Sequence, residues 1–168
     1  MAKVRIETAG EQDVLDCVRS TADLRFFLDR LHADVPVRGQ VFLAFDGADL
    51  VGHVYLRIED AEETELRDLL PGAPLLQRLR VFQGHRGKGF GRELVAAAEE
   101  TARQFGHQLI ALGVDVPRPE PIGFYLHIGY QEWPHGLVRT FTEKPRPDGA
   151  WVRETEYCRI FMKELRTA

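Results

Sequence analysis

The fold is decided by residues 75–106, which read LLQRLRVFQGHRGKGFGRELVAAAEETARQFG. Residues 75–82 are apolar with polar positions interleaved, which is typical of a strand. The turn at residues 86–91 then carries three glycines and two cations. Small and apolar residues recur at helical spacing after the turn, so we predict a helix that stops at Gly106. The stretch therefore predicts a strand, a glycine-rich turn and a helix.

This turn has the chemistry of a phosphate-binding site. The first N–H groups of a helix lack partners, and the positive end of the helix dipole lies at the same place. Glycine removes the Cβ atoms that would block phosphate oxygens, and Arg86 and Lys88 add positive charge. We predict that the turn holds the pyrophosphate of a cofactor. The alternative is a tight connection that binds nothing.

Two other phosphate-binding motifs do not fit the spacing. A P-loop requires G-x-x-x-x-G-K-[ST], whereas Lys88 stands between glycines and no Ser or Thr follows it. A dinucleotide-binding turn follows the first strand of a βαβ unit. Here the turn comes in the middle of the chain, after a predicted hairpin, which counts against that motif.

Length and composition indicate one globular domain that covers residues 1–168. The net charge of −4 argues against a general nucleic-acid binder. We see no signal peptide and no apolar run of membrane-spanning length, so no membrane partner is expected. The two cysteines lie far apart, and the six histidines show no metal-ligand spacing, so we expect a reduced, cytoplasmic protein without a metal site.

The other segments predict a mixture of helices and strands. Ser20 and Thr21 interrupt an amphipathic pattern and can cap a second helix. Six carboxylates and one arginine make residues 59–68 an acidic connection. The predicted elements are a strand at 4–8, one or two helices at 11–32, a loop at 34–39, a hairpin of 41–45 and 50–58, a strand at 108–114, a short helix at 122–128 and strands at 130–133, 138–142 and 155–165.

Two segments resemble signatures of one enzyme superfamily. The turn RGKGFG at residues 86–91 is similar to the R/Q-x-x-G-x-G/A pyrophosphate motif of the GNAT superfamily of acetyl-CoA-dependent N-acetyltransferases. The segment GFYLHIGY at residues 123–130 resembles its aromatic-Tyr-x-x-x-Gly-Tyr/Phe segment, and the order of elements fits over nearly the whole chain. The resemblance implies an α/β (α+β) fold whose central mixed, mostly antiparallel sheet is splayed at the cofactor site and flanked by helices.

The resemblance also implies the cofactor and its contacts. Acetyl-CoA would be the acyl donor, with its pantetheine amides on backbone groups near Val81 and Phe82. Arg118 stands where many members carry Asn, so the usual amide contact is not expected, although Arg118 can still reach the cofactor. The residues expected to bind the cofactor are Val81, Phe82, Arg86, Gly87, Lys88, Gly89, Phe90, Gly91, Arg118 and Tyr125.

Acyl transfer to an amine requires a neutral amine, a stabilised oxyanion and a proton for the leaving thiolate. The resemblance assigns the proton donor to Tyr125 and the oxyanion contact to a backbone N–H near Val81. The alternative is that Tyr125 is only a packed aromatic side chain of a short apolar helix. The base stays open between Glu59 and Asp60, acting directly or through water, and His135.

The acidic connection is the clearest indication of the acceptor. If its carboxylates line the cleft, they attract a cationic molecule. The pattern around it resembles a bacterial subgroup that acetylates aminoglycoside-type antibiotics such as kasugamycin, so we expect a small amine of that kind and a role in antibiotic resistance. The alternatives are a protein N-terminus, a lysine side chain, or an acyl-CoA-binding module without catalysis. The strand-rich C-terminus also suggests a homodimer.

Overall fold

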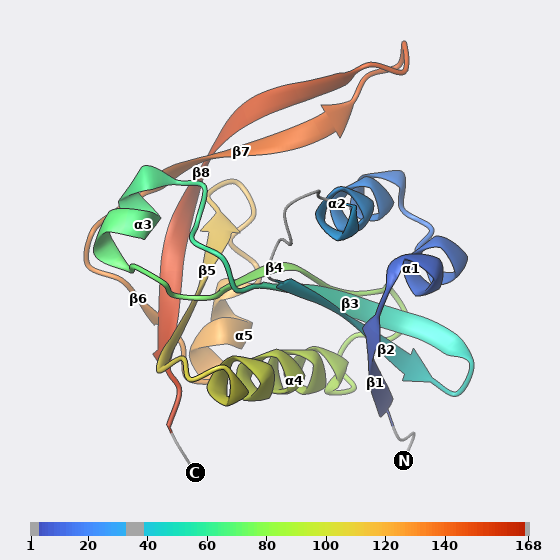
Figure 1. The fold of residues 1–168 in the computed structure, drawn as a ribbon, viewed down its shortest axis with the longest axis horizontal. Helices are drawn as coiled ribbons and strands as arrows, with labels where there is room; N and C mark the ends of the chain where they lie inside the picture. Colours follow the sequence, from blue (N-terminus) through green and yellow to red (C-terminus); the bar gives the residue numbers. More distant parts are fainter. Residues whose placement is uncertain (1–3, 33–38, 167–168) are drawn as a thin grey trace.

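A computed structural model describes residues 4–32 and 39–166 of the chain. Within them, one sheet of eight strands follows the order β1-β2-β3-β4-β5-β8-β6, with β7 paired to β8 (Figure 1). All neighbouring strands in this order are antiparallel except β4 and β5. The strands are β1 Val4–Ala9, β2 Gly39–Asp46, β3 Asp49–Arg57, β4 Leu75–Val81, β5 Leu109–Asp115, β6 Gln131–Glu132, β7 Val138–Pro145 and β8 Trp151–Glu164.

Helices cover both faces of this sheet (Figure 1). The helices α4 and α5 lie on one face, and α1 and α2 lie on the other. The helices are α1 Glu11–Cys17, α2 Thr21–Leu31, α3 Thr64–Leu69, α4 Phe90–Gln104 and α5 Ile122–His127. Leu94 and Ala98 of α4 are fully buried against the sheet, and Val14 and Phe27 are fully buried on the opposite side. The predicted mixed, mostly antiparallel fold is confirmed.

A bulge interrupts the pairing of β3 with β4. The register shifts between His53 and Tyr55, and Arg78 opposite them has a positive φ of 56°. A residue other than glycine rarely adopts this conformation, so its surroundings must stabilise it. Gly52 allows the two strands to approach, since a Cβ at that position would lie 2.5 Å from the carbonyl oxygen of Arg80. The bulge therefore adds one residue to β4, and the pairing with β3 resumes at Arg80.

Most predicted elements are observed within a few residues of their expected bounds. Ser20 caps α2, with its hydroxyl accepting a hydrogen bond from the Asp23 N–H at 3.4 Å, so the predicted helical region is two helices. The acidic connection contains α3, a helix that is not among the predicted elements. The loop predicted at 34–39 lies outside the described residues except for Gly39, which begins β2. None of the described helices is long and apolar enough to cross a bilayer.

Candidate functional site

The parallel strands β4 and β5 separate soon after they pair. They are in register only at Leu75 with Ala111 and Leu76 with Leu112, although both strands continue. From Gln77 onward the backbone groups of β4 that face β5 have no ladder partner there. The predicted splay of the sheet is therefore present. It offers an extended molecule a row of hydrogen-bonding groups.

The glycine-rich turn stands at the end of this splay. Gly87 and Gly89 have φ values of 76° and 86°, which favour glycine, and Gly89 is the N-cap of the 15-residue helix α4. A Cβ on either glycine would meet no atom within 4 Å, so the space above the turn is open. Arg86 folds back and donates from Nε to the Val81 carbonyl oxygen at 2.9 Å. The turn has the open N-terminus and nearby cation that a pyrophosphate requires.

Val81 and Phe82 differ in what their backbones can offer. The Phe82 N–H donates to the Val51 carbonyl oxygen at 2.9 Å, and the Phe82 carbonyl accepts from the His85 N–H at 3.0 Å. Alternation along an antiparallel ladder then directs the N–H of Val81 away from β3, toward β5. Val81 is thus the better placed of the two predicted backbone contacts, and Phe82 is already paired.

A cleft of about 1450 Å³ runs along β4 and joins the splay to the side chains of α2 and the β7–β8 hairpin. Tyr125 of α5 lines this cleft and is only 8% exposed. Its ring packs edge-on against Phe124 and Tyr130, which fix its position. Its hydroxyl forms no hydrogen bond with another described residue, so it is available to a ligand. Burial raises the pKa of Tyr125 to about 12.

The candidate bases occupy different places. Glu59 lines the cleft, with its carboxylate 3.9 Å from Arg57 Nη2. Asp60 is exposed and is not among the residues that line the cleft, and its carbonyl accepts hydrogen bonds from the Arg57 side chain. His135 is also exposed outside this lining, with its ring against Trp133. Of the three candidates, only Glu59 therefore faces the reaction space.

Arg118 lies on the β5 side of the cleft. Its guanidinium contacts the Asp115 carboxylate and is 3.8 Å from Glu156. The nearby Cys158 thiol donates to Asp115, and burial together with that hydrogen bond raises the Cys158 pKa to about 12. The thiol is therefore protonated, as expected for a packing residue and not for a nucleophile.

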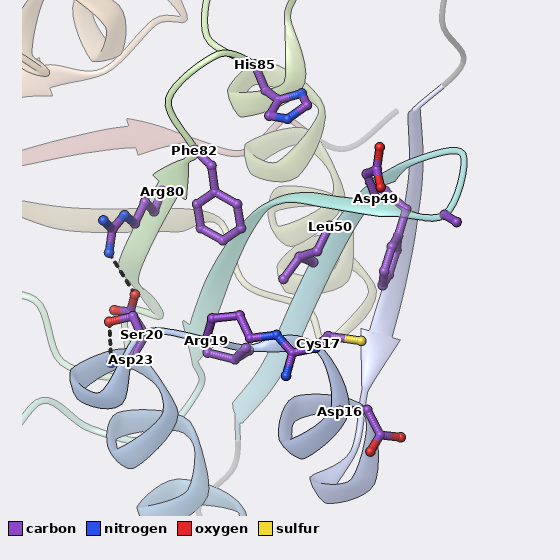
Figure 2. Close-up of a pocket in the computed structure, with 13 residues that line it drawn as sticks. Asp16, Cys17, Arg19, Ser20, Asp23, Asp49, Leu50, Arg80, Phe82 and His85 are labelled. Carbon is purple, nitrogen blue, oxygen red and sulfur yellow. Dashed lines mark hydrogen bonds and ion pairs between the residues drawn. The ribbon is translucent and has the colours of Figure 1, made fainter.

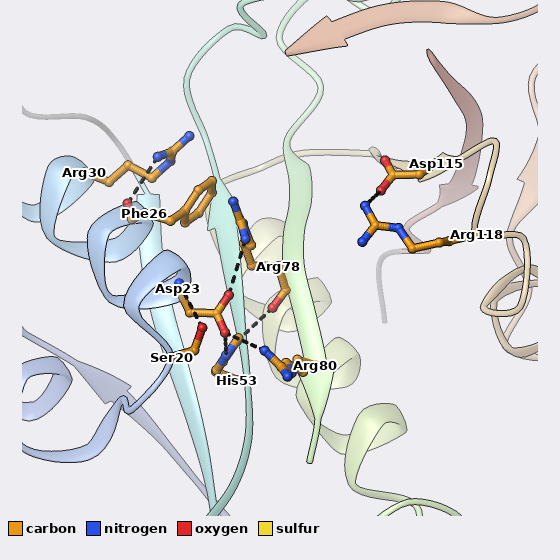
Figure 3. A network of polar contacts seen from close by, with 9 residues as sticks. All are labelled: Ser20, Asp23, Phe26, Arg30, His53, Arg78, Arg80, Asp115 and Arg118. Carbon is orange, nitrogen blue, oxygen red and sulfur yellow. Dashed lines mark hydrogen bonds and ion pairs between the residues drawn. The ribbon is translucent and has the colours of Figure 1, made fainter. Parts of the chain in front are cut away.

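A buried polar network that the sequence did not indicate lies on the other side of β4 (Figure 3). The Asp23 side chain is buried and accepts from His53 Nε2 at 3.2 Å and Arg80 Nη1 at 3.0 Å, and Arg78 Nη1 lies 3.4 Å away. His53 Nδ1 is 2.8 Å from the Arg78 carbonyl oxygen. Both ring nitrogens of His53 therefore lie within hydrogen-bond distance of an oxygen atom. The network joins α2 and β3 to the bulge of β4.

A second cavity of about 620 Å³ adjoins this network (Figure 2). It lies between the α1–α2 connection and the turn of the β2–β3 hairpin, with Arg80, Phe82 and His85 along one wall. Asp23 and Arg80 border both this cavity and the larger cleft. The described residues include no group of three or more His, Cys, Asp or Glu side chains arranged to hold a metal ion.

The splayed strands and the open helix N-terminus define a protein with the architecture of a coenzyme A-dependent acyltransferase. Residues 11–130 match the model of the acetyltransferase (GNAT) family, and the chain belongs to that family. The acyl donor of the family is acetyl-CoA.

Solved structures agree on the fold. An Escherichia coli ribosomal-protein-S18-alanine N-acetyltransferase is 15% identical with a TM-score of 0.65, covering 99% of this chain and 96% of its own. A Bacillus subtilis acetyltransferase in complex with CoA is 19% identical with a TM-score of 0.64, covering 98% of this chain and all of its own. At these identities the likeness concerns the fold.

The curated relative covers less of the chain. An aminoalkylphosphonate N-acetyltransferase of Salmonella typhimurium is 40% identical over 57 residues. That match spans 34% of this chain and 37% of the relative. It supports the family and leaves the acceptor of this chain to direct test.

Replacing Gly89 by Val is expected to weaken CoA binding at least tenfold. A β-branched residue is strained at a φ of 86°, and its side chain would stand where phosphate oxygens approach the turn. The measurement is calorimetric titration with CoA. Gly47→Val is the control, because Gly47 has a φ of 63° with open space around it in the β2–β3 turn. Equal CoA affinity in both variants would show that the pyrophosphate binds elsewhere.

Proposed function

We propose that this protein transfers the acetyl group of acetyl-CoA to a primary amine of a small molecule. The supporting observation is the continuity of one cleft. It runs from the β4–β5 splay, where the thioester would lie, past Tyr125 to the side chains of α2 and the β7–β8 hairpin. A donor and an acceptor can therefore meet beside Val81, with the Val81 N–H directed at the oxyanion.

The reaction requires one bond to form and one to break. The amine nitrogen attacks the thioester carbonyl, the tetrahedral intermediate expels the thiolate of CoA, and the former amine loses a proton. A phenol with a pKa of about 12 stays protonated at neutral pH. Full transfer of that proton to a thiolate of pKa about 8.5 is uphill by roughly 5 kcal/mol. We therefore assign Tyr125 the role of a hydrogen-bond donor that stabilises the departing sulfur.

The proton lost by the amine needs an acceptor in the cleft. We propose Glu59 for this role, because it is the candidate carboxylate that lines the cleft and its side chain keeps 30% exposure to solvent. Water can then relay the proton from the amine to Glu59 and on to bulk solvent. Asp60 and His135 would have to move to take part.

The acceptor is the least constrained part of the proposal. The acidic connection favours a cationic acceptor such as an aminoglycoside, which would make the protein an antibiotic-resistance enzyme. However, the carboxylates of Glu59 and Glu62 lie within 4 Å of Arg57, so part of their charge is balanced. The name of the curated relative adds aminoalkylphosphonates to the small amines to be tested.

Release of free thiol from acetyl-CoA tests the proposed function. The purified chain is incubated with acetyl-CoA and separately with kasugamycin, spermidine, 2-aminoethylphosphonate, β-alanine and an alanine-initiated peptide. At least one small amine should release thiol above the hydrolysis background, with a product heavier by one acetyl group. Binding of CoA without turnover of any amine would contradict catalysis and favour an acyl-CoA-binding module. Turnover of the peptide alone would favour a protein substrate.

A further inference from the structure

A pair of arginines flanks one aromatic ring on the α2 side of the cleft (Figure 3). The guanidinium carbon of Arg30 lies 3.3 Å from the centroid of the Phe26 ring, and that of Arg78 lies 4.7 Å from the same centroid. Arg30 and Phe26 come from α2, whereas Arg78 comes from the bulge of β4. All three residues line the cleft. Two cations are therefore held close together at one place.

The carboxylate of Asp23 does not balance this charge. Asp23 faces the two cations Arg78 and Arg80 together, and His53 Nε2 lies 3.2 Å from the same carboxylate. One negative charge thus meets two positive charges before Arg30 is added. Like charges at this spacing repel one another, and the repulsion is relieved when an anion enters.

Arg30 is the cation with unused hydrogen-bonding capacity. Its Nη1 donates to the Phe26 carbonyl oxygen at 3.1 Å, and its Nε is buried with no acceptor among the described residues. No carboxylate in the described part of the chain lies within 4.0 Å of it, and burial lowers its pKa. Neighbouring Arg57, by contrast, bonds to the Asp60 carbonyl and faces Glu59 and Glu62. A buried guanidinium donor without an acceptor is costly unless a ligand supplies one.

We propose that Arg30 and Arg78 form a subsite for an anionic group, a phosphonate or a carboxylate, on the acceptor amine. The inference rests on the proposed function and specifies its substrate class as small amines that also carry a negative group. Two guanidinium forks suit the oxygens of either anion, and the Phe26 ring holds their planes in place. Arg78 stands three residues before Val81 on β4, so an anion held there leaves the amine free to reach the thioester.

The subsite is separate from the expected pyrophosphate position. The glycine turn begins α4 on the face of the sheet opposite α2 (Figure 1). Asp115 and Arg118 lie across β4 from Arg78 (Figure 3). An anion bound at Arg30 therefore does not need to compete with the phosphates of CoA, and the two can be titrated independently.

A binding experiment tests the subsite without requiring turnover. The protein saturated with CoA is titrated by calorimetry with ethylphosphonate and, separately, with propionate, neither of which carries an amine. Saturable binding of at least one of them is expected, and Arg30→Gln should weaken it at least tenfold. Arg139→Gln is the control, because Arg139 also stacks on an aromatic ring, Phe141, but lies outside the cleft lining. The affinity of Arg139→Gln for these anions should stay within twofold of the wild type.

Kinetics with three amines show whether the subsite prefers a phosphonate or a carboxylate. They also separate failure of the subsite from failure of the proposed acetyl transfer. Arg30→Gln should raise KM at least tenfold for 2-aminoethylphosphonate, β-alanine or both. It should leave the KM unchanged for acetyl-CoA and for ethanolamine, which lacks an anionic group. The anion with the larger change is the preferred group. The proposed subsite would be wrong if the wild type bound neither anion. It would also be wrong if Arg30→Gln and Arg139→Gln lost the same amount of affinity for the anion. If ethylphosphonate bound through Arg30 but no amine were acetylated, the subsite would stand and the proposed function would fail.

Discussion

Tyr125→Phe is expected to lower kcat at least 100-fold while leaving the affinity for CoA within twofold of the wild type. The hydroxyl lies in the cleft with no partner among the described residues, whereas the ring is held by Phe124 and Tyr130. Phenylalanine retains that packing and removes the donor alone. Positioned proton donors and hydrogen-bond donors typically contribute 10²-fold to 10⁴-fold to the rate.

The measurement is single-turnover acetylation with the best amine from the thiol assay, which reports chemistry and not product release. Tyr157→Phe is the matched control, because Tyr157 is 51% exposed on β8 and does not line the cleft. Unchanged turnover in Tyr125→Phe would remove the hydroxyl from the mechanism and leave Tyr125 as a packing residue. A CoA affinity that fell in parallel with the rate would instead indicate that the hydroxyl serves donor binding.

The pH dependence of the reaction provides a separate check on the role of Tyr125. Burial holds its pKa at about 12, so the donor form persists across the range in which the protein is assayed. Between pH 6 and 10, deprotonation of Tyr125 should therefore not lower the single-turnover rate. Any decline of the rate in this range should also be present in Tyr125→Phe. A wild-type decline below pH 10 that disappears in the variant would indicate a proton transfer from a phenol of lower pKa.

The strand, turn and helix at residues 75–106 could be predicted because their signals are local. Glycines set the turn, and apolar residues recur over four turns of α4. The helix α3 was missed because six residues give too short a stretch for periodicity, and its single buried residue, Leu66, stands among charges. Its burial depends on packing against distant parts of the chain.

The Asp23 network could not be predicted because its members come from α2, β3 and β4, 30 to 57 residues apart. In an amphipathic helix Asp23 looks like any exposed carboxylate, yet it is buried. One signal was present. Arg78 and Arg80 are two residues apart in a predicted strand, so in a regular strand both side chains would lie on the same face of the sheet. Two cations on one covered face require a nearby carboxylate.

Replacing Asp23 by Asn is expected to lower the free energy of unfolding at pH 7 by about 3 kcal/mol. The amide keeps the size of the side chain but leaves Arg78 and Arg80 without the carboxylate that balances their charge. Removing one member of a buried ionic network typically costs 3–5 kcal/mol. Since His53 supports the Arg78 carbonyl, the bulge of β4 should loosen as well, and kcat should fall with stability.

The dependence on pH distinguishes this account from a simple loss of packing. Burial alone would raise the pKa of Asp23, but the His53 hydrogen bond and the charges of His53, Arg78 and Arg80 lower it from 3.8 to about 2. The resulting stabilisation, roughly 2.4 kcal/mol, is complete above the unfolded-state pKa and is lost as the pH falls toward 2. The difference in stability between the wild type and Asp23→Asn should therefore shrink between pH 4 and pH 2.

Urea unfolding at pH 7 and at pH 3 measures both effects. Asp29→Asn is the matched control, because Asp29 lies on the same helix, is exposed, and faces only Arg25 at 3.9 Å. An exposed pair of this kind contributes at most about 1 kcal/mol, so the control should resemble the wild type at both pH values. Equal stability of Asp23→Asn and Asp29→Asn at pH 7 would show that the buried carboxylate does not hold β4 in its bulged conformation.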